Sequence, residues 1–169
     1  KGPSRKFGMG LEAQTSQFLD SYGYNRVGLN LNGPLIKSKD PKKTTSLLGY
    51  FLAGEFIYNE DGYPNATGVY RIKDDVLSAI EQEPLRLTGT GTGTYYNTDF
   101  LTSDDVERID YTQNSSNYRA NFSGKIDVRT SDLTNLSFGG NFTYRNSDNF
   151  SYGSSLANWN NNSHTYQTT

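Results

Sequence analysis

The sequence contains no cysteine, a single histidine, one methionine and one tryptophan among its 169 residues. Without cysteine the chain has neither a disulfide framework nor a thiolate metal site. The lone histidine, His164, lies in an Asn-rich stretch, which argues against a Ser-His-Asp triad and a histidine-based metal site. The sequence therefore predicts no catalytic residues and no metal site of this kind, and we expect the protein not to be an enzyme.

Long hydrophobic runs are also missing. The mean hydropathy is −0.74, and no segment approaches the roughly 18 consecutive apolar residues that a transmembrane helix needs, so helical membrane spans are excluded. The net charge of −2 and the isoelectric point near 5.4 argue against nucleic acid as a partner. The chain is instead rich in aromatic residues, with 13 Tyr and 9 Phe.

The clearest pattern is an alternation of apolar and polar residues between Tyr118 and Arg145. A period of two is typical of a β-strand with one apolar and one polar face. The alternation covers Tyr118–Arg129 and resumes over Leu136–Arg145, and the intervening Thr130–Asn135 is rich in residues that favour turns. We expect a hairpin of two long strands.

The length of these strands and the charge on one face indicate a transmembrane β-barrel. A strand in a soluble protein usually has about five or six residues, whereas a tilted strand of about ten residues spans an outer membrane. Charged residues on the inner face suit a water-filled lumen. The residues predicted to face lipid are Phe122, Ile126, Val128, Leu136, Phe138 and Phe142. Those predicted to face the lumen are Arg119, Lys125, Asp127 and Arg145.

Three earlier segments show the same alternation. Phe7–Ala13 permits a strand, a loop over Thr15–Tyr24 follows, and Arg26–Ile36 reads as a second strand. After a basic turn at Lys37–Lys43, a further strand is expected over Ser46–Tyr58. The second face of that strand is more apolar than open water would favour, so we expect something to cover it from inside the barrel.

The region 59–117 is expected to be a long connection without strands, lying outside the cell because barrels of this kind keep their long loops there. It contains a predicted helix over Asp74–Glu83, a flexible Gly/Thr tract over Thr88–Thr94, and a capping box at Thr102–Asp105 before a brief helix ending at Ile109. The Ser/Asn-rich stretch from Asn146 to Thr169 is expected to form part of another outer loop.

Some side chains of the long connection are too apolar to remain exposed to water, and they need a surface to bury against. These are Val76, Leu77, Ile80, Leu85, Leu87, Val106 and Ile109. Its acidic residues offer a minority hypothesis of calcium binding, because calcium prefers clustered oxygen ligands. They are Asp74, Asp75, Asp104, Asp105 and Glu107, which lack EF-hand spacing and are accounted for by helix capping.

Several segments, in their order and spacing, resemble the early barrel of SusC-like TonB-dependent outer-membrane transporters. The resemblance starts with Tyr22–Asn25, Leu31–Ile36 and Leu48–Glu55 and extends over most of the chain up to about Tyr144. Its later pieces are Tyr63–Gly68, Lys73–Leu77, Phe100–Asp105 and Gly124–Asp127. In this family a Gly-Pro-Leu/Ile strand end, a periplasmic turn and an aromatic strand recur in that order.

The resemblance implies an all-β fold, with the whole chain, 1–169, forming about four or five strands of a closed antiparallel barrel of about 22 strands. Because an open sheet in lipid leaves unpaired edges and the sequence contains neither a plug nor a TonB box, we expect the chain to be a portion of a larger protein. The implied partners are the rest of the barrel, the TonB complex, the lipid bilayer and a SusD-like surface lipoprotein. The lipoprotein would dock on Val76, Leu77, Ile80, Val106 and Ile109; the alternative is that these residues pack only on loops of their own barrel.

The resemblance implies import of oligosaccharides or peptides across the outer membrane of a Gram-negative bacterium, without a cofactor. A second hypothesis is a non-transporting structural or assembly subunit built on the same barrel. A third is a secreted β-sandwich that binds glycans. The sandwich predicts shorter strands and a dry inner face, which Lys125, Asp127 and Arg129 contradict.

Overall fold

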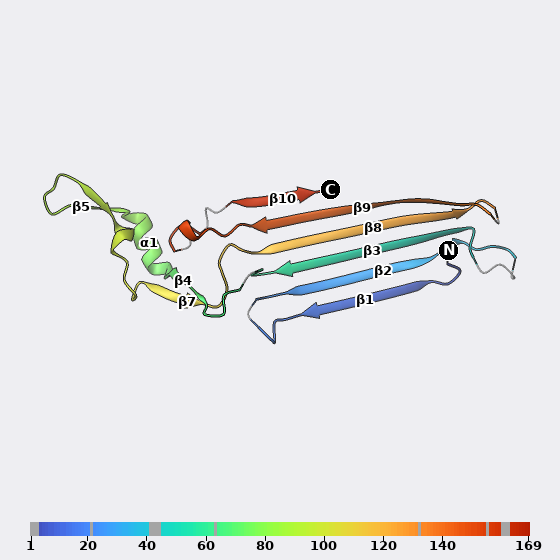
Figure 1. Cartoon of the computed structure of the whole chain (residues 1–169), viewed down its shortest axis with the longest axis horizontal. Helices are drawn as coiled ribbons and strands as arrows, with labels where there is room; N and C mark the ends of the chain where they lie inside the picture. The colour runs from blue at the N-terminus through green and yellow to red at the C-terminus, as the bar shows by residue number, and fades with distance from the viewer. Residues whose placement is uncertain are drawn as a thin grey trace.

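The computed structural model describes residues 4–20, 22–40, 45–62, 64–131, 133–154, 156–159 and 163–169. Its main element is an antiparallel sheet of six strands in the order β1-β2-β3-β8-β9-β10 (Figure 1). Sequential strands are neighbours except between β3 and β8, where a long segment is inserted. The strands are β1 Gly8–Thr15, β2 Asn25–Ile36, β3 Leu48–Asn59, β8 Asn117–Arg129, β9 Asn135–Asp148 and β10 His164–Thr168.

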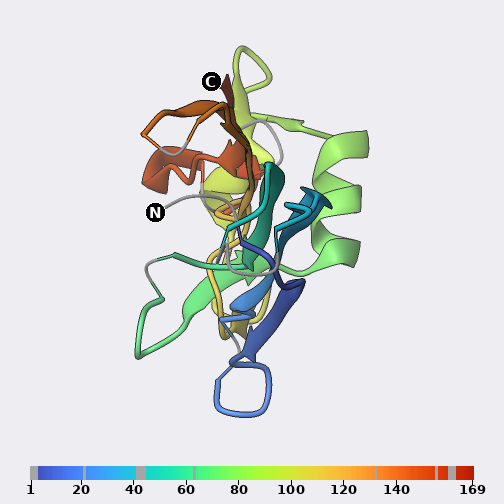
Figure 2. The same cartoon turned by 90° about the vertical axis from the view of Figure 1, so that its right-hand side faces the viewer.

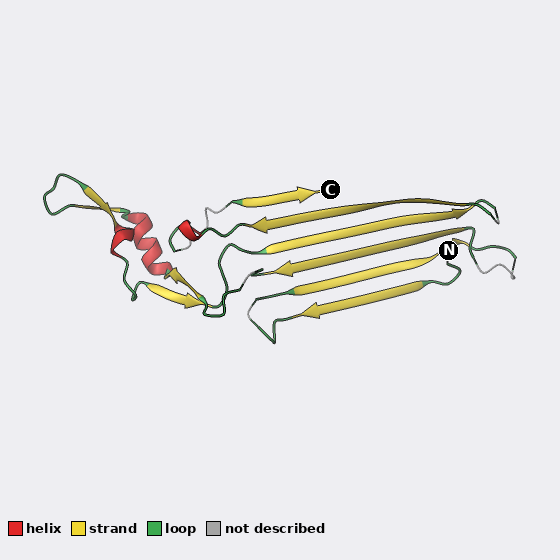
Figure 3. Ribbon diagram, in the orientation of Figure 1, coloured by secondary structure: helices red, strands yellow, loops and turns green. Residues whose placement is uncertain are grey.

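The inserted segment, residues 60–116, is called the extension and lies beyond one end of the sheet (Figure 1). Two small antiparallel pairs organise it, β4 with β7 and β5 with β6, and a single α-helix lies between β4 and β5 (Figure 3). Its elements are β4 Val69–Ile72, α1 Asp74–Gln82, β5 Leu85–Leu87, β6 Thr94–Tyr96, the 3-10 helix η1 Asn97–Phe100, and β7 Val106–Ile109. A further 3-10 turn, η2 Tyr152–Ser154, joins β9 to β10.

The four long strands confirm the strands predicted from alternation. β8 and β9 pair without a break, from Asn117 opposite Ser147 to Arg129 opposite Asn135. The polar turn between them sets a register in which the apolar residues of both strands share one face. In β2 the pairing shifts between Pro34 and Ile36. Proline has no N–H to donate to the ladder, so this irregularity at the strand end accommodates it.

The prediction of a strand-free connection over 59–117 is wrong. Val69–Ile72 pairs with Val106–Ile109, and Leu85–Leu87 pairs with Thr94–Tyr96. The brief helix expected up to Ile109 is therefore a strand, because its β-branched residues pair with β4. The helix expected over Asp74–Glu83 is confirmed as α1.

The expected outer loop over Asn146–Thr169 is also corrected. Residues Asn146–Asp148 continue β9, and β10 pairs with them from His164 opposite Asp148 to Thr168 opposite Tyr144. The main sheet therefore has six strands rather than four or five. A strand as short as β10 lacks the length over which a period of two is recognisable.

Among the described residues the sheet is one layer thick: its strands lie edge to edge, and α1 and the small strand pairs lie beyond its end rather than over a face (Figures 1 and 2). Of the described residues, Ile72 in the extension is the one buried hydrophobic side chain. Edge strands β1 and β10 each have one neighbour, so the sheet is not closed within the described residues. In this part of the chain, no helix has the length and apolar character needed to cross a membrane.

Candidate functional site

The apolar face of the sheet carries the residues predicted to face lipid. Phe122 lies opposite Phe142, Ile126 opposite Phe138, and Val128 opposite Leu136 in the β8–β9 ladder. Residues directly opposite one another in an antiparallel pair point to the same face, so all six share it. The side chains are open to the surroundings, with Phe122 55% and Phe138 65% exposed.

This apolar face continues across the neighbouring strands. Leu52 of β3 lies opposite Leu31 of β2, which in turn lies opposite Met9 of β1. Near the extension, ring contacts run across three strands. The Phe56 and Tyr118 ring centroids are 5.5 Å apart, and those of Tyr118 and Tyr144 are also 5.5 Å apart. The apolar face is thus a continuous uncovered surface bordered by an aromatic row.

The polar face carries all four residues predicted to face the lumen. The Lys125 ammonium lies 3.0 Å from the Asp127 carboxylate, and the Ser137 hydroxyl donates to the same carboxylate at 2.5 Å. Arg119 and Arg145 lie directly opposite each other across β8 and β9. The polar face therefore contains paired charges near one end and an arginine pair near the other.

A network of charged side chains that the sequence did not reveal crosses four strands on this face. Arg26 of β2 forms ion pairs with Glu12 of β1 at 2.8 Å and with Glu55 of β3 at 2.6 Å. The Asn121 amide of β8 donates to the second oxygen of Glu55 at 3.0 Å. Each residue occupies a polar position of its strand, but only the register brings them together.

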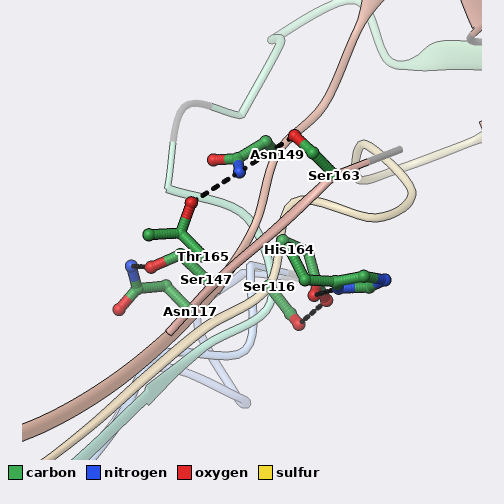
Figure 4. Close-up of polar contacts among 8 residues, drawn as sticks. Ser116, Asn117, Ser147, Asn149, Ser163, His164 and Thr165 are labelled. Carbon is green, nitrogen blue, oxygen red and sulfur yellow. Dashed lines mark hydrogen bonds and ion pairs between the residues drawn. The ribbon is translucent and has the colours of Figure 1, made fainter. Parts of the chain in front are cut away.

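The end of the sheet near the extension is held by polar contacts between β10 and the strands beside it (Figure 4). The Asn117 and Ser147 side chains form a hydrogen bond at 2.7 Å across β8 and β9. The Asn149 amide donates to the Thr165 hydroxyl at 2.9 Å and to the Ser163 hydroxyl at 3.3 Å. These contacts fasten the short strand β10 to the sheet.

His164 belongs to the same cluster, together with a serine and an aspartate. Its Nδ1 lies 2.5 Å from Oδ1 of Asp148, and the Ser116 hydroxyl donates to Oδ2 of Asp148 at 2.6 Å (Figure 4). A catalytic triad places the histidine between the serine and the acid. Here the carboxylate lies between the other two, so the cluster does not have the geometry of a nucleophile and its base.

The five residues predicted to dock a partner lie in the extension and are half-buried there. They are Val76, Leu77, Ile80, Val106 and Ile109. The two most exposed large apolar side chains of the extension instead lie on the β5–β6 hairpin, where Leu87 is 74% and Tyr96 is 64% exposed. The Arg86 guanidinium stacks over the Phe100 ring at 3.7 Å and so joins this hairpin to η1.

The Gly/Thr tract forms the turn of that hairpin. The Thr88 N–H donates to the Gly93 carbonyl at 2.8 Å, and the Gly91 N–H donates to the Thr88 carbonyl at 2.9 Å. Gly91 has a φ of 69°, which a glycine adopts without steric cost. The tract therefore has a defined hydrogen-bonded conformation.

Three of the five acidic residues considered for calcium binding, Asp74, Asp105 and Glu107, are engaged with other groups. Asp105 accepts from the N–H of Thr102 at 2.8 Å and from its hydroxyl at 2.7 Å, and these bonds lower the pKa of its carboxyl. Arg71 forms ion pairs with Glu107 at 2.6 Å and with Asp74 at 3.5 Å. Within the described residues no group of three or more His, Asp or Glu side chains could hold a metal ion, so the calcium hypothesis has no site there.

Comparisons of the chain with models of protein families, with curated proteins and with solved structures found no match. The fold itself defines the class: an all-β chain built on an antiparallel sheet. That sheet has one apolar and one charged face, and it carries an extension at one end.

Proposed function

We propose that the chain is part of the barrel wall of a SusC-like TonB-dependent transporter, which imports oligosaccharides or peptides across the outer membrane with a SusD-like lipoprotein. One observation carries the proposal. Four neighbouring strands of 12 to 14 residues expose a continuous apolar face on one side and a charged face on the other. A bilayer and a water-filled lumen would provide the two environments that these faces need.

The strand lengths agree with a membrane span. A strand rises about 3.3 Å per residue, so 12 residues cover about 40 Å. At a tilt of about 45° such a strand crosses about 28 Å, close to the roughly 30 Å of a hydrocarbon core. Strands of a soluble β-sandwich usually have about five or six residues. The strands of this sheet are longer, so the hypothesis of a glycan-binding sandwich is less well supported.

The uncovered faces and free edges support the same proposal. A sheet without a hydrophobic core is not stable by itself in water, because folding needs buried apolar surface to offset the lost conformational entropy. Lipid would cover Phe122, Phe138 and their neighbours. The unpaired edges of β1 and β10 would pair with the remaining strands of a closed barrel, which leaves no backbone group unsatisfied in lipid.

The transport activity in this proposal rests on the resemblance to SusC-like transporters. Two of its segments, Leu31–Ile36 and Leu48–Glu55, are neighbours in the sheet, with Pro34 opposite Gly49. The extension and the short connections after β2 and β8 lie at opposite ends of the sheet (Figure 1). This polarity agrees with an outer mouth formed by the extension and a periplasmic end formed by the short turns.

The test compares cells that carry or lack the complete protein, each with and without TonB. Uptake of labelled oligosaccharides and peptides is measured, and membranes are fractionated in parallel. We expect the protein in the outer membrane, and uptake that requires both the protein and TonB. The structural or assembly role would be established instead by a different result. In that case the protein resides in the outer membrane, and its loss leaves uptake of both solute classes unchanged while a membrane complex dissociates.

A further inference from the structure

Two arginines face each other directly on the polar side of the sheet. Arg119 of β8 is the partner of Arg145 of β9 in the antiparallel ladder. Directly opposite side chains in such a pair have their Cβ atoms about 5 Å apart, and like charges in this arrangement are destabilising. The pair therefore needs a compensating negative charge.

The sheet does not supply that charge. On the polar face the immediate neighbours of the pair are neutral, with Gln167 opposite Arg145 and with Asn121 and Thr143 two ladder positions away, as the next pair on that face. Among the described residues no carboxylate forms an ion pair with either arginine. Glu55 is close enough to Arg119 for an electrostatic interaction, but it already binds Arg26 and Asn121.

The charges in this part of the face leave one cation uncompensated. Three arginines, Arg26, Arg119 and Arg145, stand against two glutamates, Glu12 and Glu55. Both glutamates contact Arg26. The arginine pair is thus the positive end of the cross-strand network.

One of the two guanidinium groups is held in position by neutral partners. Arg145 Nε donates to the Ser147 hydroxyl at 3.0 Å. With the oxygen of its amide turned toward Arg145, Asn117 accepts from Nη2 at 2.9 Å. These bonds orient the guanidinium without neutralising it, and both arginines are half-buried. Preorganised donors of this kind bind an anion at a reduced entropic cost.

We propose that Arg119 and Arg145 together bind a carboxylate on the polar face of the sheet. A guanidinium presents two parallel N–H groups that match the two oxygens of a carboxylate, and an anion between the two arginines removes their mutual repulsion. The carboxylate has two sources, a free solute such as a uronic acid or a carboxylate side chain of a polypeptide that covers this face. The inference goes beyond the proposed function and does not depend on transport.

The experiment uses the complete protein purified in detergent, with D-glucuronate as the probe and D-glucose as its neutral counterpart. Calorimetry compares the wild type with Arg119→Gln and Arg145→Gln. The control, Arg108→Gln, removes the same charge from β7 of the extension. For a free solute we expect binding of glucuronate but not glucose, weakened roughly ten- to a hundredfold in the two test variants alone. Glucuronate binding that both test variants retain would overturn the proposal.

Thermal unfolding of the same variants distinguishes the second source. If a polypeptide carboxylate occupies the site, glucuronate does not bind, and Arg119→Gln and Arg145→Gln unfold at lower temperatures than Arg108→Gln. If no carboxylate binds there, Arg119→Gln relieves the repulsion between the two arginines, whereas Arg145→Gln also loses the hydrogen bonds of Arg145 to Ser147 and Asn117. Absence of glucuronate binding together with an unchanged or raised unfolding temperature in Arg119→Gln therefore contradicts the proposal. Membrane fractionation of the wild type separately reports on the proposed outer-membrane function.

Discussion

Lys125 and Phe138 lie on opposite faces of the sheet, although they are close neighbours in the β8–β9 hairpin. Lys125 is opposite Gly139, whereas Phe138 is opposite Ile126. A shift of the register by a single residue would exchange the two faces. The uninterrupted pairing of β8 with β9 therefore keeps charge and apolar surface apart.

A lysine at position 138 should hinder insertion into a bilayer. Phe138→Lys places a charge on the apolar face, and the expected cost is about 2–4 kcal/mol near the middle of the membrane. The control is Asn141→Lys on the polar face, where Asn141 lies opposite Ser123. Folding into lipid vesicles is measured by urea titration. Insertion of Phe138→Lys as readily as Asn141→Lys would contradict a lipid-facing position for Phe138.

The ion pair between Arg26 and Glu55 should stabilise the contact between β2 and β3. Arg26→Gln and Glu55→Gln are each expected to lower the free energy of unfolding. The double variant is expected to lower it by less than the sum of the two single effects, because the second substitution has no ion pair left to break. Glu12→Gln is the comparison, since Glu12 is more exposed than Glu55 and its contribution is screened by solvent. Additive effects of Arg26→Gln and Glu55→Gln would show that the contact contributes nothing.

The long strands were predictable because alternation is a local signal. Val27 to Leu35 and Tyr118 to Val128 each repeat it over at least five positions on one face. The strands of the extension were missed because β5 and β6 have three residues each. β4 also finds its partner β7 far along the chain, with Val69 opposite Ile109.

The composition of the two faces was predictable, and the contacts within them were not. Lys125 and Asp127 are two residues apart, so their proximity follows from alternation alone. The network of Arg26, Glu55 and Asn121 joins residues 29 and 66 positions apart. This network can be predicted only from the order and register of β2, β3 and β8, which depend on pairing that no local pattern specifies.

The two ends of the sheet should be accessible from opposite sides of the outer membrane. Because the chain has no cysteine, Thr90→Cys in the β5–β6 turn and Lys39→Cys in the connection after β2 each provide a single labelling site within residues 1–169. An impermeant maleimide applied to intact cells is expected to label Thr90→Cys alone, and to label both variants after permeabilisation. Labelling of Lys39→Cys alone in intact cells would reverse the orientation.

The contact between Thr102 and Asp105 should open in acid. Hydrogen bonds from Thr102 lower the folded-state pKa of Asp105 below its ordinary value of 3.8. The stabilisation is therefore present above pH 3.8 and is lost as the pH falls through the lower folded-state pKa. Hydrogen exchange at the Thr102 amide should accelerate in that range. Asp105→Asn removes this pH dependence, and Thr102→Val returns the pKa of Asp105 toward its ordinary value.

Unchanged acid dependence in Asp105→Asn would mean that another group controls the exchange. Ser103 provides a control because its hydroxyl makes no hydrogen bond recorded among the described residues, so Ser103→Ala should leave the profile as it is in the wild type.

If the proposed SusD-like lipoprotein covers the barrel, the β5–β6 hairpin should contribute to its docking. Leu87 and Tyr96 expose large apolar side chains at the far end of the extension, whereas Val76 and Ile80 are half-buried. Exposed apolar side chains grouped at the tip of an element are a common mark of an interaction site. Leu87→Asp together with Tyr96→Asp should therefore reduce the amount of lipoprotein that co-purifies from outer membranes.

The matched control for this prediction changes charge on the same hairpin without changing its apolar surface. Thr90→Asp together with Thr92→Asp lies in the exposed turn and adds the same two negative charges. Because the hairpin is fastened to η1 through Arg86 and Phe100, substitutions at its exposed positions should leave membrane insertion unaffected. If the Leu87 and Tyr96 variant inserts normally and retains as much lipoprotein as the Thr90 and Thr92 variant, the hairpin packs only against loops of its own barrel.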